Sequence, residues 1–119
     1  MFRLILDQLL ATTGGALAAM FLDFEGEMVE LVCDRDLSDH DLRIIGAYQG
    51  IYLTRLRELC ETLDAGKPER FKIEFATTTM LSYDLKDGYY VVLLVAPGSN
   101  EGIAWQSLRR CREQLLEEM

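Results

Sequence analysis

The side chains best suited to metal binding or nucleophilic attack are three cysteines and one histidine. Cys33, Cys60 and Cys111 are far apart, form no C-x-x-C pair, and have only His40 to complete a ligand set. Zinc sites and disulfide frameworks need closely spaced or paired cysteines, so neither is expected. All three cysteines lie on or beside predicted apolar faces, where a thiol stays protonated and unreactive. We therefore expect free thiols in a reducing cytoplasm and no Cys–His catalytic pair.

A cluster of oxygen-bearing side chains before the longest predicted helix suggests calcium. Counted from Asp34, positions one, three and five of the loop are Asp34, Asp36 and Ser38. An EF-hand also needs glycine at position six and glutamate at position twelve, where this chain has Asp39 and Ile45. The cluster therefore fails as a calcium loop. Its acids favour the positive start of a helix, and the Ser38 hydroxyl can accept the backbone N–H three residues on.

Motifs for phosphate binding and acyl transfer are also missing. The sequence has no G-x-x-x-x-G-K-[ST] loop and no G-x-S-x-G elbow. The stretch 98–102 could offer backbone N–H groups to an anion at a helix start, but Glu101 would repel that anion. These patterns predict no catalytic residues, no metal and no cofactor, and they argue against an enzyme.

Composition and charge narrow the class of protein further. The 119 residues are 50% hydrophobic and 27% charged, which is typical of one soluble domain spanning 1–119. Twenty acidic residues against twelve basic ones give a net charge of −8, which repels phosphate backbones and anionic lipid. Nucleic-acid and membrane partners are therefore not expected. The longest uncharged stretch, 8–22, is too short and interrupted to span a bilayer, so we expect a cytoplasmic protein.

The spacing of apolar residues predicts eight elements that would position any site. Steps of three and four indicate helices, whereas alternation or short apolar runs indicate strands. The predicted order is helix 2–13, strands 16–23 and 28–33, helix 38–65, strands 70–76, 79–86 and 89–96, and helix 103–118. Asp87-Gly88 predicts a two-residue hairpin between the last two strands.

The character of each strand predicts its place in the sheet. The continuously apolar runs 16–23 and 89–96 belong in the centre, beside each other, and the alternating strand 70–76 belongs at an edge. We therefore predict an α+β fold of order α-β-β-α-β-β-β-α with a five-stranded antiparallel sheet in the order 2-1-5-4-3. The long second helix should cover one face and the terminal helices the other.

The long helix carries more apolar residues than one covered face needs. Nine residues share the arc that we expect to pack on the sheet: Leu42, Ile45, Gln49, Tyr52, Leu53, Leu56, Leu59, Cys60 and Leu63. Ile44, Tyr48 and Ile51 fall on a neighbouring arc. They predict a protein–protein surface, with cover by the chain's own loops as the alternative. Gly46 and Gly50, on the opposite flank, would allow close backbone approach.

The predicted edge strand indicates how a second copy could bind. Phe71, Ile73 and Phe75 alternate with Lys72 and Glu74, which gives one dry face, one wet face and an open edge. If two copies pair antiparallel in a suitable register, Lys72 of one faces Glu74 of the other. We therefore predict a twofold homodimer, strand to strand, with the long helices side by side. Its interface would comprise Ile44, Tyr48, Ile51, Phe71, Lys72, Ile73, Glu74 and Phe75.

Several short motifs cover nearly the whole chain. They are Gly14–Asp23 with Gly26 in the following turn, the long helix containing Tyr and Ala, Asp87-Gly88-Tyr89-Tyr90 leading into Val91–Val95, and Asn100-Glu101-Gly102 followed by Leu108-Arg109. Together with the order of elements, they resemble the roadblock/dynein light-chain family, which includes bacterial regulators of Ras-like gliding-motility GTPases.

The resemblance implies a non-catalytic dimeric regulator or scaffold that binds a small Ras-like GTPase and modulates its nucleotide cycle. In such dimers the paired long helices form a platform for the partner. Carried over to this chain, the platform would be drawn from Arg43, Ala47, Tyr48, Ile51, Arg55 and Glu58. The alternatives are an adaptor subunit without GTPase regulation and a small-molecule sensor of profilin-like topology. A sensor needs a concave apolar cavity with convergent polar groups, and the sequence shows no such cluster.

Overall fold

A computed structural model describes residues 1–33 and 37–119 of the chain. Its elements are α1 (Phe2–Thr12), β1 (Ala16–Leu22), β2 (Met28–Cys33), α2 (Asp39–Leu63), β3 (Arg70–Glu74), β4 (Thr79–Asp84), β5 (Tyr90–Val95) and α3 (Glu101–Glu118). This order confirms the predicted fold class. Asp34 and Asp36, which raised the question of a calcium loop, lie outside the described residues.

The five strands form one antiparallel sheet in the order β2-β1-β5-β4-β3, as predicted. β1 and β5 lie beside each other in the centre, with Met20 opposite Val92 and Ala19 opposite Leu93. Nearly every residue of these two strands is buried, because helices cover both faces of the sheet. A run without polar positions is stable only in such a place.

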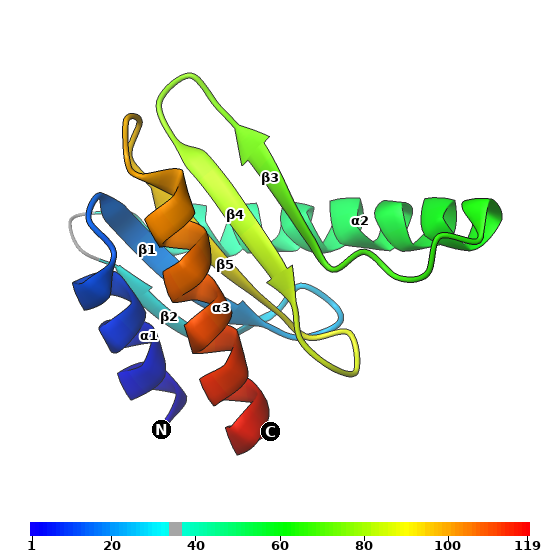
Figure 1. The fold of residues 1–119 in the computed structure, drawn as a ribbon, viewed down its shortest axis with the longest axis horizontal. Helices are drawn as coiled ribbons and strands as arrows, with labels where there is room; N and C mark the ends of the chain where they lie inside the picture. Colours follow the sequence, from blue (N-terminus) through cyan, green and yellow to red (C-terminus); the bar gives the residue numbers. More distant parts are fainter. Residues whose placement is uncertain (34–36) are drawn as a thin grey trace.

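The sheet separates two apolar cores (Figure 1). On one face, α1 and α3 pack side by side over residues that include Phe21, Leu81 and Leu93. On the other face, α2 packs through Leu42 and Leu53 onto residues that include Met20 and Val92. The predicted three-layer arrangement is therefore confirmed, and α2 stands apart from the terminal helices.

Local signals account for most element boundaries. The turn between β4 and β5 has Asp87 and Gly88 at φ 55° and 82°, the left-handed pair that a two-residue hairpin needs. Ser38 caps α2, since its hydroxyl accepts the Asp41 backbone N–H at 3.3 Å. Helix α3 begins two residues earlier than predicted because the Asn100 side chain accepts the Ile103 backbone N–H at 3.0 Å.

The prediction that nine residues of α2 pack on the sheet is wrong for Tyr52, Leu59 and Leu63, which are exposed. Figure 1 shows α2 crossing the face of the sheet with its C-terminal turns extending beyond β3, which accounts for Leu59 and Leu63. Tyr52 is in the middle of the helix, next to the buried Leu53, and lies at the side of the buried stripe. Within the described residues, no helix is long and apolar enough to cross a membrane.

Candidate protein interaction surfaces

Three glycines bring α2 close to the turn between β1 and β2. A Cβ atom on Gly50 would lie 3.0 Å from the Cα atom of Gly26, and Gly46 packs under the Leu22 side chain. The hydroxyl of Tyr90, buried in the sheet, donates to the Gly46 carbonyl at 3.2 Å. The expected close approach at Gly46 and Gly50 is therefore confirmed. It fixes the rotation of α2 about its axis, and so decides which side chains face outward.

The outer face of α2 points away from the sheet and is open to solvent. At ~100° per residue, Ile44 and Ile51 lie opposite the buried stripe, and Tyr48 lies between them and the flank that carries Tyr52. Tyr48 is 56% exposed and Ile51 is 53% exposed, so the chain's own loops do not cover them. The remaining platform residues predicted from the resemblance are also exposed: Arg43, Ala47, Arg55 and Glu58. All six predicted platform residues are therefore exposed along α2.

Among the described residues, the ion pairs along this outer face join neighbouring helix residues. Arg43 donates to the Asp39 carboxylate at 2.7 Å, and Arg55 contacts Glu58 at 3.5 Å. All four side chains are more than half exposed, so each pair contributes little to stability. Their charges remain available to a partner that approaches this face.

A second apolar stripe, exposed except at the half-buried Leu56, runs along the flank of α2 that also carries Ile45, and the sequence interpretation missed that it is exposed. Tyr52, Leu56, Leu59 and Leu63 follow one another at steps of four, three and four. Leu59 is 52% exposed and Leu63 is 65% exposed. We call these four residues the flank stripe. The heptad-like spacing was visible in the sequence, but how far α2 extends beyond the sheet was not.

β3 forms one edge of the sheet, and its dry face lies on the α2 side. Phe71 and Ile73 are half-buried against the core beneath α2, whereas Phe75, just past the strand, is 54% exposed. Across the part of the chain that the structure describes, β3 pairs only with β4. The alternation predicted for this strand is confirmed, and its outer edge is open.

The wet face of β3 is tied to α3 by its own charges. Lys72 contacts Glu74 and Glu101 at 2.9 Å each. Hydrogen bonds to Glu101 and then Glu74 raise the pKa of Lys72, and the bond from Lys72 lowers the pKa of Glu101. The Arg70 guanidinium lies 5.0 Å from the centre of the Trp105 ring, a cation–π contact. Glu101, which would repel an anion, thus serves to hold the edge strand.

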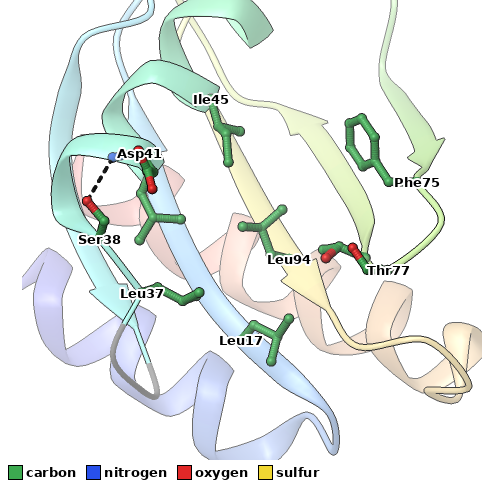
Figure 2. Close-up of a pocket in the computed structure, with 10 residues that line it drawn as sticks. Leu17, Leu37, Ser38, Asp41, Ile45, Phe75, Thr77 and Leu94 are labelled. Atoms are coloured by element: carbon green, nitrogen blue, oxygen red, sulfur yellow. Dashed lines mark hydrogen bonds between the residues drawn. The ribbon is translucent and has the colours of Figure 1, made fainter.

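An apolar groove of about 460 Å³ lies between the first turns of α2 and the turn that joins β3 to β4. Leu17 and Leu94 form its floor, and Ile45 and Phe75 rise on either side (Figure 2). The polar rim consists of Ser38, Asp41, Thr77 and Thr78. Since Ile45 lies on the same side of α2 as the flank stripe, this groove and the stripe belong to the flank that faces β3.

A buried carboxylate anchors the far half of α2 to the sheet. Asp84, at the end of β4, contacts Lys67 at 3.0 Å and Arg57 at 3.5 Å, and only 7% of its side chain is exposed. Arg57 also donates to the Gly88 carbonyl at 3.1 Å. These contacts hold α2 where it leaves the sheet, and so keep the flank stripe in a fixed position.

The cysteines differ more than the sequence suggested. Cys111 is buried between α1 and α3, and burial raises its pKa to about 12, so its thiol is protonated at neutral pH. Cys60 is half-buried, but Cys33 is exposed, and its expected place on an apolar face is wrong because it ends an edge strand. Among residues 1–33 and 37–119, no three His, Cys, Asp or Glu side chains are placed to hold a metal ion.

Among the comparisons with known proteins, only the comparison of three-dimensional structures gives matches. No protein-family model matches the sequence, and no curated protein matches it. The roadblock/LC7 domain from Streptomyces avermitilis is similar with a TM-score of 0.84 at 11% identity, covering 95% of this chain and 92% of that one. The gliding protein MglB from Thermus thermophilus has a TM-score of 0.87 at 14% identity, covering 98% and 86%.

Two further structures show which known folds this chain resembles more and which it resembles less. MglC from Myxococcus xanthus has a TM-score of 0.70 at 24% identity, covering 99% of this chain and 98% of that one. Profilin II from Acanthamoeba castellanii covers the same shares of the two chains with a TM-score of only 0.64 at 12% identity. The arrangement of elements is therefore nearer to that of the roadblock/LC7 domain and MglB than to that of profilin.

Proposed function

We propose that this chain, whose fold is that of roadblock/LC7 domains, is a non-catalytic, dimeric, cytoplasmic regulator of a small Ras-like GTPase. The fold supports the proposal because the sequence resembles a family that includes regulators of such GTPases, and the structural neighbours include a gliding protein, MglB. The observation that carries it is the open outer face of α2. Tyr48 and Ile51 are exposed there although nothing in the fold requires apolar residues at these positions.

The two apolar surfaces of α2 suggest a division of roles. The flank stripe shares its side of α2 with Ile45, which lines one groove together with Phe75. We therefore assign this flank and the residues Phe71, Ile73 and Phe75 to a second copy. The outer face points away from the sheet, so we assign Tyr48 and Ile51 to the GTPase. Ile44, Tyr48 and Ile51 were predicted to lie in the dimer interface, and Tyr48 and Ile51 were predicted in the partner platform as well. This assignment gives all three residues to the partner surface.

The proposal predicts that Tyr48→Ala combined with Ile51→Ala weakens GTPase binding. Truncating two interface anchors costs about 2–4 kcal/mol, which is roughly 30- to 1,000-fold in the dissociation constant. Both side chains are more than half exposed, so the melting temperature should hardly change. Isothermal titration of the source organism's small Ras-like GTPases, loaded with GDP or a non-hydrolysable GTP analogue, measures the effect.

The matched control carries Leu4→Ala and Ile103→Ala. These exposed apolar residues lie on α1 and α3, across the sheet from α2. The control should bind the GTPase as the unmodified chain does. Equal binding by the Tyr48/Ile51 variant would show that the outer face of α2 is not the partner surface. Binding without any change in GTP hydrolysis or nucleotide exchange would instead indicate an adaptor.

A further inference from the structure

Arginines and aromatic rings are stacked on the face of the sheet that lies opposite α2. Arg70 and Tyr83 face each other across β3 and β4. The Arg70 guanidinium lies 5.0 Å from the centre of the Trp105 ring in α3, and the centres of the Trp105 and Tyr83 rings are 6.1 Å apart. The Arg112 guanidinium in turn lies 5.1 Å from the centre of the Tyr83 ring. The four side chains therefore form one continuous stack that joins β3, β4 and α3.

The same flank of α3 carries a further arginine. Trp105, Arg109 and Arg112 follow one another at steps of four and three, so they lie on one side of the helix. Figure 1 shows α3 in front of the sheet, α2 behind it and β3 at the edge of the sheet. We call Arg70, Tyr83, Trp105, Arg109 and Arg112 the arginine strip. It lies across the sheet from both apolar surfaces of α2.

The chain itself does little to neutralise the arginines of the strip. Among the described residues, neither Arg70 nor Arg112 forms an ion pair, and Arg109 reaches only Glu113, at 3.9 Å. Lys72 on the same face differs, since it contacts two carboxylates at 2.9 Å each. The chain has a net charge of −8, so acidic side chains are plentiful. Three arginines nevertheless gather here without a close carboxylate of their own.

Stacking on a ring leaves the hydrogen-bonding edge of a guanidinium open. The ring contacts one flat face, whereas the N–H groups point outward in the plane of the guanidinium and match the two oxygens of a carboxylate. Arg112 uses one of these groups, since its Nε donates to the Asp84 carbonyl at 2.5 Å. Arg70 and Arg109 are exposed. Because the rings hold Arg70 and Arg112 in place, less conformational freedom is lost when these arginines bind an anion.

The charge of the whole molecule decides between the anionic partners that such a strip could bind. DNA carries one phosphate charge per ~1.7 Å of its axis, and a net charge of −8 repels so dense a polyanion. A peptide segment with a few aspartates or glutamates is repelled less, and it offers a planar carboxylate to each guanidinium. Glu74 and Glu101 lie beside Lys72 at one end of this face. The acidic side chains of a bound segment would therefore lie toward Arg109 and Arg112.

We propose that the arginine strip is a docking site for a short acidic segment of a partner protein, whose carboxylates are bound by Arg70, Arg109 and Arg112. This inference goes beyond the proposed function and does not depend on it. The strip and the outer face of α2 lie on opposite sides of the sheet, so both can be occupied at once. A chain that binds an acidic segment but no GTPase would keep this inference and remove the proposed function.

Trp105 is the one tryptophan in the sequence, so tryptophan fluorescence reports directly on the strip. The full chain is titrated with a hexaglutamate peptide and, in parallel, with hexaglutamine. We expect hexaglutamate to change the Trp105 emission saturably, with a dissociation constant below about 1 mM at low salt that rises as salt is added. Hexaglutamine should leave the emission unchanged. If hexaglutamate gave no saturable change, the inference would be overturned, and the arginines would only hold β3 to α3.

Two matched double variants test which arginines bind the peptide. Arg70→Gln with Arg109→Gln removes two charges from the strip, whereas Arg3→Gln with Arg110→Gln removes two charges on the α1 side of the same face. Each variant breaks one long ion pair, at 3.9 Å or 3.5 Å, and all four side chains are exposed, so both should fold. We expect the first to raise the dissociation constant at least about tenfold and the second to change it less than about twofold.

Two results of this comparison contradict the inference. Equal losses in the two variants would show that the peptide responds only to the overall charge of the chain. Tighter binding of a single-stranded oligothymidylate than of hexaglutamate, measured by the same emission, would show that the strip is a nucleic-acid surface.

Discussion

Gly50 decides how closely α2 lies against the turn between β1 and β2. Its missing side chain leaves room for Gly26 and for the Tyr90 hydroxyl, which would lie 3.2 Å from an added Cβ atom. Backbone atoms cannot move aside as a flexible side chain can. Gly50 therefore contributes, together with Gly46 and Gly26, to the rotation of α2 and to the position of its exposed apolar surfaces.

Gly50→Ala should accordingly destabilise the fold, although alanine favours helices. We expect a loss of about 1–3 kcal/mol because the added methyl group overpacks the contact with Gly26. Gly102→Ala in α3 is the control, since its Cβ atom would meet only the Asn100 side chain at 3.5 Å. It should raise stability by up to ~1 kcal/mol. Urea denaturation measures both, and the same sign of change for the two variants would refute the close approach.

Individual residues could be placed on elements from the sequence, but their partners could not. Lys72 was assigned to the wet face of an edge strand, and that is correct, but its contact with Glu101 depends on where α3 ends up over the sheet. Gln49 was assigned to the buried arc, and the structure pairs its amide with Ser82. Such pairs join residues 29 or 33 positions apart, and only the tertiary arrangement brings them together.

Asp84 holds one secondary-structure element against another: it lies at the end of β4 and contacts Arg57 of α2 and Lys67, which follows α2. Asp84→Asn should destabilise the chain by about 1–2 kcal/mol, because it leaves Arg57 without its buried partner while Lys67 remains largely solvated. Glu58→Gln, which breaks an exposed pair on the same helix, should change stability by less than ~0.5 kcal/mol. Thermal unfolding measures the difference, and equal effects of the two variants would contradict the anchoring role.

The sequence was most informative about the type and order of the helices and strands. Strand order followed from which runs lacked a polar face, because only the centre of a two-sided sheet tolerates them. The position of α2 across the sheet was less predictable. Periodicity shows which residues share a side of a helix, but not where the covering layer ends. Tyr52, Leu59 and Leu63 were therefore assigned to the core, although they are exposed.

The whole molecule presents two apolar surfaces on one helix, pointing in different directions. A monomer that worked alone would have no use for either, since exposed apolar surface favours association. We propose the flank beside β3 as the surface for a second copy and the outer face of α2 as the surface for a different protein. A pair of copies would present two outer faces on the same side of one continuous sheet, which is a platform larger than either copy provides.

Native mass spectrometry of the chain mixed with a nucleotide-loaded small Ras-like GTPase from the same organism tests this account most directly. It reports how many copies of each protein are bound in one experiment. We expect a complex that contains two copies of this chain and at least one GTPase. The account would be contradicted if the chain were detected only as single, unbound copies at micromolar concentration with every small Ras-like GTPase of that organism, loaded with either GDP or a GTP analogue.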